Sequence, residues 1–195
     1  MEPWPDHPVE VVRRRTRPLS PWLQIDEIEV RMPGSTGVET YHGLRQADAA
    51  MVLAMTADFQ FLIVRQYRPV IEAWTWELPA GCVDPGEDPA AAAARELAEE
   101  TGYRVGRMIP LGALHEDPPR RTNRIYDFFA LLEPEPSAPE AGMAPRLVSG
   151  GDLKAMALAG ELAVPSQVAL LFRAACNAEV QQFLRALGLQ SPPWI

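Results

Sequence analysis

The sequence lacks the features that mark secreted or membrane-spanning proteins. Only two cysteines occur among 195 residues, Cys82 and Cys176, too few and too far apart for a disulfide framework or a cysteine metal site. Apolar runs are short, as at residues 61–64, and residues 1–30 contain no continuous apolar stretch. We therefore expect no signal peptide, no membrane span and a reduced, cytoplasmic setting.

Positive charge is also scarce. Eighteen Lys and Arg face 26 Asp and Glu, which gives a formal net charge of −8. Such a chain is a poor candidate for binding nucleic acid or an anionic membrane, and we expect neither as a partner. Two local basic clusters remain, at residues 13–17 and 120–124. Each fits either a small phosphorylated ligand or a solvated loop, and for residues 13–17 we expect the loop.

The length of 195 residues and the hydrophobic content of 47% allow one good core with terminal additions. Residues 22–30 alternate as a strand does, and a Pro-Gly turn at 33–37 leads into a second strand at 38–44. We therefore expect residues 1–45 to form an N-terminal arm with a small antiparallel sheet, and residues 46–195 to form the main domain.

The main domain is predicted to be of the α/β class. Its expected strands are residues 49–56, 59–67, 74–78, 108–115 and 125–132, the first two forming a hairpin. Residues 133–145 carry four prolines and three glutamates and are predicted to be an extended loop. Helices are expected at 152–163 and 166–187, and the apolar stripe of the second should pack in the core. Together these elements indicate an α/β sandwich with a mixed sheet.

One helix is defined by its end signals. Asp88 is a good N-cap, Pro89 suits the first helical position, and the alanines that follow have high helix propensity. Gly102 can adopt the left-handed conformation just beyond the last turn. The sequence therefore predicts a helix over residues 89–101.

That helix carries an unusual group of carboxylates. Glu96, Glu99 and Glu100 are spaced to lie on one face, and Glu87 comes just before the helix. Such a cluster is unfavourable unless a cation compensates it, and Arg95 can offset only part of the charge through Glu99. Carboxylate oxygens without a nearby His or Cys favour Mg²⁺ or Mn²⁺. The alternative, a solvated helix face, explains a glutamate-rich run on its own but not the glycine turn before it.

The stretch from Gly81 to Gly102 resembles the Nudix box, with every fixed position filled and Tyr103 at a position that is usually aliphatic. Two further segments, residues 65–69 (RQYRP) and 76–81 (WELPAG), are similar to the ADP-ribose pyrophosphatase (ADP-sugar diphosphatase) branch of the Nudix hydrolase family. The proline pair at 118–119 is also similar to that branch, although Arg120 follows where the branch often has glycine. The resemblance implies the Nudix α/β/α sandwich.

The resemblance also assigns roles to site residues. It implies that Glu96 and Glu100 hold Mg²⁺, or Mn²⁺ as a substitute, aided by Glu99 and the backbone carbonyl of Ala80. Arg95 would orient these carboxylates. The branch keeps its general base in a loop after the box, which points to Glu140 here. Glu135 is the second choice.

Substrate contacts are expected from residues near the predicted strands. A nucleoside diphosphate needs a guanidinium near its phosphates and an aromatic surface for its base. Arg68 is the expected phosphate contact, and Glu77 either accepts hydrogen bonds from the ligand or pairs with Arg68. Trp22 is the expected stacking residue, with Trp74 and Trp76 as further candidates. In the resembled branch the N-terminal sheet is exchanged across a homodimer, and we expect the same here.

The resulting functional hypothesis is metal-dependent hydrolysis of the pyrophosphate bond of a nucleoside diphosphate sugar, ADP-ribose first of all, to AMP and ribose 5-phosphate. One alternative is another nucleoside diphosphate derivative, such as a nucleotide sugar, a dinucleoside polyphosphate or a coenzyme. The other is a ligand sensor with the same fold and no catalysis.

Overall fold

The computed structural model describes residues 9–133 and 137–195 and divides the chain into two compact units. The first contains Met1–Ala47 together with His115–Asn123, and the second contains Asp48–Leu114 together with Arg124–Ile195. The segment His115–Asn123 was not expected to belong with the N-terminal sheet. It joins that sheet through main-chain hydrogen bonds to Leu44, which no side-chain pattern predicts.

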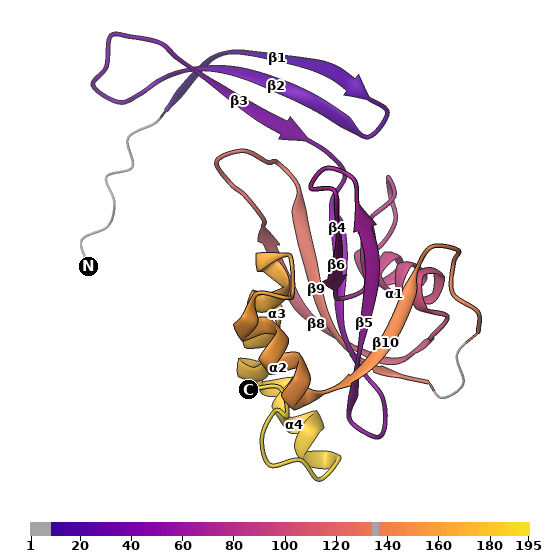
Figure 1. The fold of residues 1–195 in the computed structure, drawn as a ribbon. Helices are drawn as coiled ribbons and strands as arrows, with labels where there is room; N and C mark the ends of the chain where they lie inside the picture. The colour runs from indigo at the N-terminus through magenta and orange to yellow at the C-terminus, as the bar shows by residue number, and fades with distance from the viewer. Residues whose placement is uncertain (1–8, 134–136) are drawn as a thin grey trace. The chain divides into compact units, whose positions relative to one another are not determined.

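The N-terminal unit is a three-stranded antiparallel sheet in the order β1-β2-β3 (Figure 1). Its strands are β1 (Glu10–Ser20), β2 (Leu23–Arg31) and β3 (Glu39–Arg45). The expectation of a loop at residues 13–17 was wrong, because these residues lie within β1. Every residue of β1 is exposed, so no apolar alternation marks the strand, and two of its arginines pair instead with acids on β2, Arg14 with Asp26 and Arg15 with Glu27.

The second unit contains a seven-stranded mixed sheet in the order β10-β5-β4-β9-β8, with β6 paired to β5 and β7 paired to β4. The strands are β4 (Ala49–Met55), β5 (Gln60–Arg68), β6 (Ala73–Glu77), β7 (Ala80–Cys82), β8 (Val105–His115), β9 (Arg124–Leu132) and β10 (Ala144–Ser149). β4 and β9 are parallel. The expected hairpin of β4 and β5 pairs at a single position, Met55 with Phe61, and the strands then separate so that β6 and β7 pair with them.

Alternation along the central strands produces two apolar layers. Met51, Leu53 and Met55 of β4 face one core, and Ala50, Val52 and Ala54 face the other. Helix α1 (Pro89–Thr101) covers the second core, while α2 (Gly150–Ala159), α3 (Pro165–Cys176) and α4 (Ala178–Ala186) cover the first (Figure 1). The predicted α/β/α sandwich with a small N-terminal antiparallel sheet is therefore confirmed.

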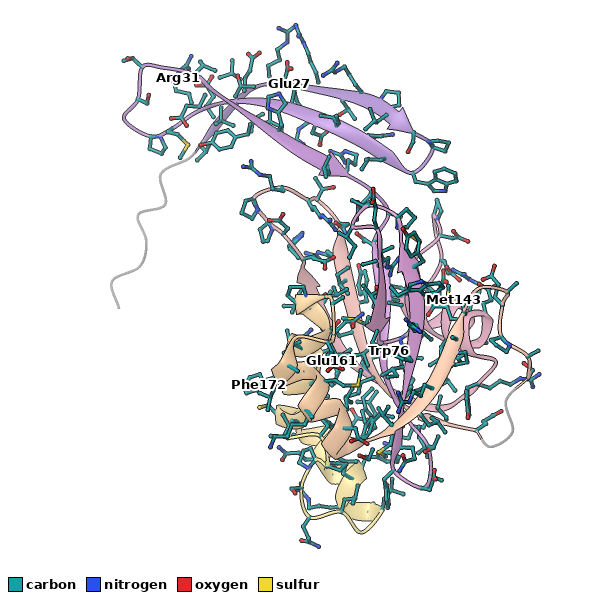
Figure 2. All side chains as sticks on the ribbon, in the orientation of Figure 1. Glu27, Arg31, Trp76, Met143, Glu161 and Phe172 are labelled. Atoms are coloured by element: carbon teal, nitrogen blue, oxygen red, sulfur yellow. The ribbon has the colours of Figure 1, made fainter. Side chains whose placement is uncertain are left out.

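The C-terminal third differs from the prediction in two respects. The single helix expected at 166–187 is two helices, because Asn177 ends α3 and its side chain caps α4 by accepting from the Val180 N–H. Part of the expected core stripe is exposed, since Phe172 is 64% exposed and points away from the sheet (Figure 2). The end of the predicted loop is strand β10, where Pro145 is tolerated because β10 is an edge strand.

Candidate active site

The helix α1 begins and ends where the sequence predicts. The Asp88 carboxylate accepts hydrogen bonds from the N–H groups of Ala90 and Ala91, and Pro89 occupies the first turn. Gly102 ends the helix with φ of 77°, a conformation that glycine adopts without steric cost. These caps fix the rotation and length of the helix, and so the direction of its carboxylate face.

Arg95 gathers three carboxylates around its guanidinium. Its Nε and Nη2 donate to the two oxygens of Glu87 at 3.0 and 2.9 Å. Its Nη1 donates to Glu96 at 2.9 Å and to Glu99 at 3.3 Å, and Nη2 also donates to the carbonyl of Cys82 at 3.1 Å. The Arg95 hydrogen bonds hold the pKa of Glu87 below its usual range. Arg95 thus ties the helix to the turn before it and orients Glu96 and Glu99.

Gly81 allows Glu96 to lie directly against the backbone of β7. A Cβ atom at Gly81 would stand 2.0 Å from Cδ of Glu96, closer than any real contact. The Glu96 carboxylate therefore occupies space that any other residue at position 81 would fill. This close approach gives the glycine of the box a steric reason.

Glu100 is the most buried acid of the helix, at 5% exposure. Burial raises its pKa to about 8, and the neighbouring charges of Glu96 and Glu77 add to the rise, while the hydrogen bond from the Ala80 N–H at 3.1 Å opposes it. Its charged form is therefore poorly compensated by the protein. Ala80 contacts Glu100 through its amide N–H, and the expected role of its carbonyl as a metal ligand stays a prediction.

A second cation lies near Glu100 on the end of β5. Arg68 donates from Nε and Nη2 to both oxygens of Glu77, at 2.7 and 2.5 Å, and Glu77 is 1% exposed. Thr75 adds a hydroxyl hydrogen bond to Glu77 at 2.7 Å. Burial alone would raise the pKa of Glu77, but the bonds from Arg68 and Thr75 outweigh it and hold that pKa below its usual value. Of the two expected roles for Glu77, pairing with Arg68 is the one present.

The loop that contains Glu140 contacts the C-terminal end of α1. The Glu140 N–H donates to the carbonyl of Glu99 at 2.8 Å, and the Ser137 N–H donates to the carbonyl of Gly102 at 2.9 Å. Ala98, Glu99, Ala138, Pro139 and Glu140 line a shared, open pocket of about 510 Å³. The exposed Glu140 therefore stands beside the acidic face of α1, while Glu135 lies outside the described residues.

The arrangement fits a hard divalent cation by its donor chemistry. Among the residues that the structure describes, no three His, Cys, Asp or Glu side chains are gathered closely enough to hold a metal, and Arg95 lies against Glu96 and Glu99 instead. Glu100, however, is a buried carboxylate beside Glu96, and burial raises its pKa more than the Ala80 N–H and the nearby Arg68 charge lower it. All the donors are oxygens, which Mg²⁺ and Mn²⁺ prefer.

Sequence reasoning missed part of this site. Thr75 was not singled out, although its place two residues before Glu77 on the same strand puts both on one face. Glu87 was seen only as a nearby acid, whereas it is the main partner of Arg95. Trp22 belongs to the N-terminal unit, where it is 80% exposed, and its stacking role stays a prediction.

Comparison with known proteins identifies the family. The NUDIX domain model matches residues 45–156, which is more than half of the chain. An ADP-ribose pyrophosphatase of Mycobacterium tuberculosis is 32% identical over 175 residues, covering 82% of this chain and 84% of that protein. The chain therefore belongs to the Nudix family. The resemblance to the ADP-ribose pyrophosphatase branch and the expected class, a Nudix hydrolase, are confirmed.

Two more comparisons extend this result. A CMP-5'-(N-acetyl-N-hydroxy-3-aminopropyl)phosphonate hydrolase of Streptomyces rubellomurinus is 42% identical over 85 residues, 44% of this chain and 41% of that protein. A solved structure of an ADP compounds hydrolase aligns with a TM-score of 0.73 at 19% identity, covering 92% of this chain and 96% of its own, which supports the fold. In three curated relatives, the part that aligns with this chain is less than half of the relative's own length, namely 41%, 45% and 47%.

The described part of the chain contains no helix that is both long and apolar enough to cross a membrane.

Proposed function

We propose that this protein hydrolyses the pyrophosphate bond of a nucleoside diphosphate sugar in a metal-dependent reaction, with ADP-ribose as the first candidate and AMP and ribose 5-phosphate as products. One observation carries the proposal: the capped helix α1 presents Glu96, Glu99 and Glu100 beside Arg95, with Glu96 seated on the backbone at Gly81. The relative from Mycobacterium tuberculosis, an ADP-ribose pyrophosphatase, supports the choice of substrate.

Glu96, Glu99 and Glu100, with the carbonyl of Ala80, would hold Mg²⁺, for which Mn²⁺ is the expected substitute. Such an ion supplies charge neutralisation of the diphosphate, polarisation of phosphorus and a lowered pKa for the attacking water. Glu100 is suited to this role because its buried charge is the one that the protein leaves least compensated. Bringing a cation beside it stabilises the ionised carboxylate.

The other side chains bind the substrate and move the proton. Arg68 uses Nε and Nη2 for Glu77, so its remaining nitrogen, Nη1, is the atom we assign to a diphosphate oxygen. Water attacks one phosphorus atom, the bridging P–O bond breaks, and Glu140 accepts the proton that the water gives up. Trp22 is assigned to stacking on the base.

We further propose a homodimer in which residues 22–44 are exchanged between chains, located in the cytoplasm. The exposed apolar side chains of the N-terminal unit, Trp22 and Leu19 among them, are consistent with burial against a second chain. Both cysteines are free and exposed, which is consistent with a reducing compartment. Light scattering at micromolar concentration tests the dimer, and a monomer there would contradict strand exchange.

A substrate panel tests the proposed reaction. ADP-ribose, other nucleotide sugars, dinucleoside polyphosphates and a CMP-linked phosphonate are each incubated with Mg²⁺ or Mn²⁺, and released phosphate is read after coupling to a phosphatase. We expect the highest kcat/KM for ADP-ribose and no turnover in the presence of a chelator. The CMP-linked compound is included because the relative from Streptomyces rubellomurinus is named as a hydrolase of that class.

Two outcomes would redirect the proposal. Preferential turnover of another compound in the panel would establish a different nucleoside diphosphate derivative as the substrate. No turnover of any compound with either metal, together with measurable ligand binding, would establish the non-catalytic sensor.

A further inference from the structure

A pocket of about 570 Å³ lies wholly within the N-terminal unit. All three strands of its sheet contribute, through Arg17 of β1, Ile25 of β2 and Leu44 of β3, and the remaining wall comes from the segment His115–Asn123. The volume is in the range of about 300–1,000 Å³ that small-molecule sites occupy. None of these residues has a part in the proposed hydrolysis.

The segment that forms this wall is fixed to the sheet by its main chain. The Leu44 N–H donates to the carbonyl of Arg120 at 2.7 Å, and the Thr122 N–H donates back to the carbonyl of Leu44 at 3.1 Å. Upstream, the carbonyl of Asp117 accepts from the N–H groups of Arg120 and Arg121 at 2.9 and 2.7 Å. The turn and the strand-like pairing together hold two consecutive arginines at the pocket.

The pocket concentrates positive charge in a chain whose net charge is −8. Arg17, Arg120 and Arg121 line it against one acid, Asp117. Arg121 has a distant ion pair with Glu116 at 3.6 Å, but in the described part of the chain neither Arg17 nor Arg120 forms an ion pair. The guanidinium groups of Arg17 and Arg120, which form no ion pair within residues 9–133 and 137–195, are therefore the ones we assign to a ligand.

The floor of the pocket is apolar. Ile25 lies between Arg17 and Leu44 in the strand register, and both Ile25 and Leu44 are half-buried. A flat, apolar ligand surface can lie over these two side chains while an anionic group reaches the arginines beside them. The Asp117 carboxylate only accepts hydrogen bonds, so it selects a ligand group that donates, such as a hydroxyl or an amine.

We propose that this pocket binds a mononucleotide. The phosphate lies among Arg17, Arg120 and Arg121, whose planar forks match phosphate oxygens, and the base lies over Ile25 and Leu44. Asp117 accepts from a ribose hydroxyl or an exocyclic amine. Binding at this pocket requires no metal and no turnover, so it stands or falls separately from the proposed hydrolysis.

The test uses the full chain in the presence of a chelator, so that metal-dependent binding at α1 is absent. Calorimetry with AMP measures the affinity, and amide NMR shifts locate the ligand. We expect one site per chain, shifts at Gly43 and Leu44, and affinity losses of at least about tenfold for Arg17→Ala and for Arg120→Ala. Arg13→Ala is the matched control, because Arg13 is an exposed arginine on the same strand that does not line the pocket.

Three results would overturn the proposal. Equal weakening by Arg13→Ala would mean diffuse attraction to the charged strand. Inorganic phosphate binding as tightly as AMP would remove the role of the apolar floor. Shifts confined to residues 96–100, with binding lost in Glu96→Gln, would place the ligand at α1. Arg17→Gln and Arg120→Gln serve as second variants, and an unchanged Tm for each shows that lost affinity is not lost folding.

Discussion

Asp26 in the N-terminal sheet and Glu100 in α1 are carboxylates almost fully shielded from solvent, at 0% and 5% exposure, but Glu100 is surrounded by far more protein and the two have opposite electrostatics. Asp26 accepts from Arg45 at 2.6 Å, from Thr16 at 2.6 Å and from Arg14 at 3.2 Å, and the Arg45 bond leads in holding its pKa below the usual range. Glu100 receives a bond from the N–H of Ala80, and burial raises its pKa to about 8.

The difference separates a carboxylate with a structural role, Asp26, from the one to which we assign metal binding, Glu100. Burial costs both groups hydration, but only Asp26 recovers it within its own unit through charged and hydroxyl partners. Glu100 remains costly to ionise until a cation arrives, which is the arrangement expected where binding matters more than stability. Glu77 resembles Asp26, because hydrogen bonds from Arg68 and Thr75 compensate its buried charge and lower its pKa.

The largest expected effect concerns a third carboxylate, which is exposed and so belongs to neither class. If Glu140 is the general base, Glu140→Gln should lower kcat by about 10²- to 10⁴-fold, the usual effect of losing a positioned proton acceptor, with little change in KM or metal affinity. Steady-state kinetics and metal titration check this. Near-parental kcat in both Glu140→Gln and Glu135→Gln would exclude a general base in the loop. Glu99 would then be the acid to which we assign activation of the water.

Glu100→Gln sharpens the comparison directly. It should lower kcat by about 10²- to 10³-fold, as expected for loss of one preorganised electrostatic group, and Glu96→Gln should behave in the same way. Because Glu100→Gln removes a buried carboxyl that is costly to ionise, the Tm of that variant without metal should stay equal to that of the parent or rise slightly. Calorimetric melting with and without Mg²⁺ measures both effects. A large fall in Tm of the metal-free variant would make Glu100 structural, like Asp26.

Gly81→Ala tests whether space, and not only charge, distinguishes the site. The added methyl would overlap Glu96, so Glu96 must move, and we expect a loss in metal affinity of at least about tenfold, the scale of disturbed ligand support. Gly151→Ala is the matched control, because the nearest atom to its Cβ is Oγ of Ser149 at 3.8 Å. Equal metal affinity in both variants would show that Glu96 is not held by the backbone at residue 81.

A smaller effect is expected at Thr75, which positions Arg68 through Glu77. Thr75→Val keeps the shape but removes the hydroxyl bond, and we expect KM to rise by about 3- to 10-fold, the equivalent of one net hydrogen bond, with kcat less affected. Thr75→Ser should restore the parental KM. If the valine variant lowers Tm but leaves KM unchanged, the hydroxyl contributes only to folding.

The smallest effect on activity is expected at Asp26. Asp26→Asn should lower stability at neutral pH by about 1–3 kcal/mol, because its arginine partners lose the negative charge and one of the two acceptor oxygens, and leave kcat near the parental value. A depressed pKa contributes stability that is present above the unfolded value of 3.8 and is lost as the pH falls through the folded value. The stability gap between variant and parent should therefore narrow below pH 3.8. A gap that is independent of pH would show that Asp26 acts by shape and not by charge.

The sequence predicts the box helix better than the elements that surround it. Asp88, Pro89 and Gly102 act locally, so the bounds of α1 follow from neighbouring residues alone. Strand β1 escapes prediction because all its side chains are exposed and its pairing depends on β2. The Arg68 pair with Glu77 was one of two open alternatives, and only the register of β5 and β6 decides between them. The hydrogen bond from Arg95 to the carbonyl of Cys82 could not be predicted, because a main-chain acceptor leaves no pattern in the side chains of the sequence.

The attachment of the loop to α1 has a consequence for how such proteins diversify. Ser137 and Glu140 reach the helix end through their N–H groups, which every residue except proline possesses, and the glycine at 102 leaves room for the loop carbonyl of Ser137. The attachment of the loop to α1 is therefore mostly independent of its side chains, the exception being the Ser137 hydroxyl, which also donates to the Gly102 carbonyl at 3.2 Å. Substitutions in this loop therefore need not detach the chain from α1, so the chemistry presented to the substrate can change over evolutionary time while the scaffold that presents it stays the same.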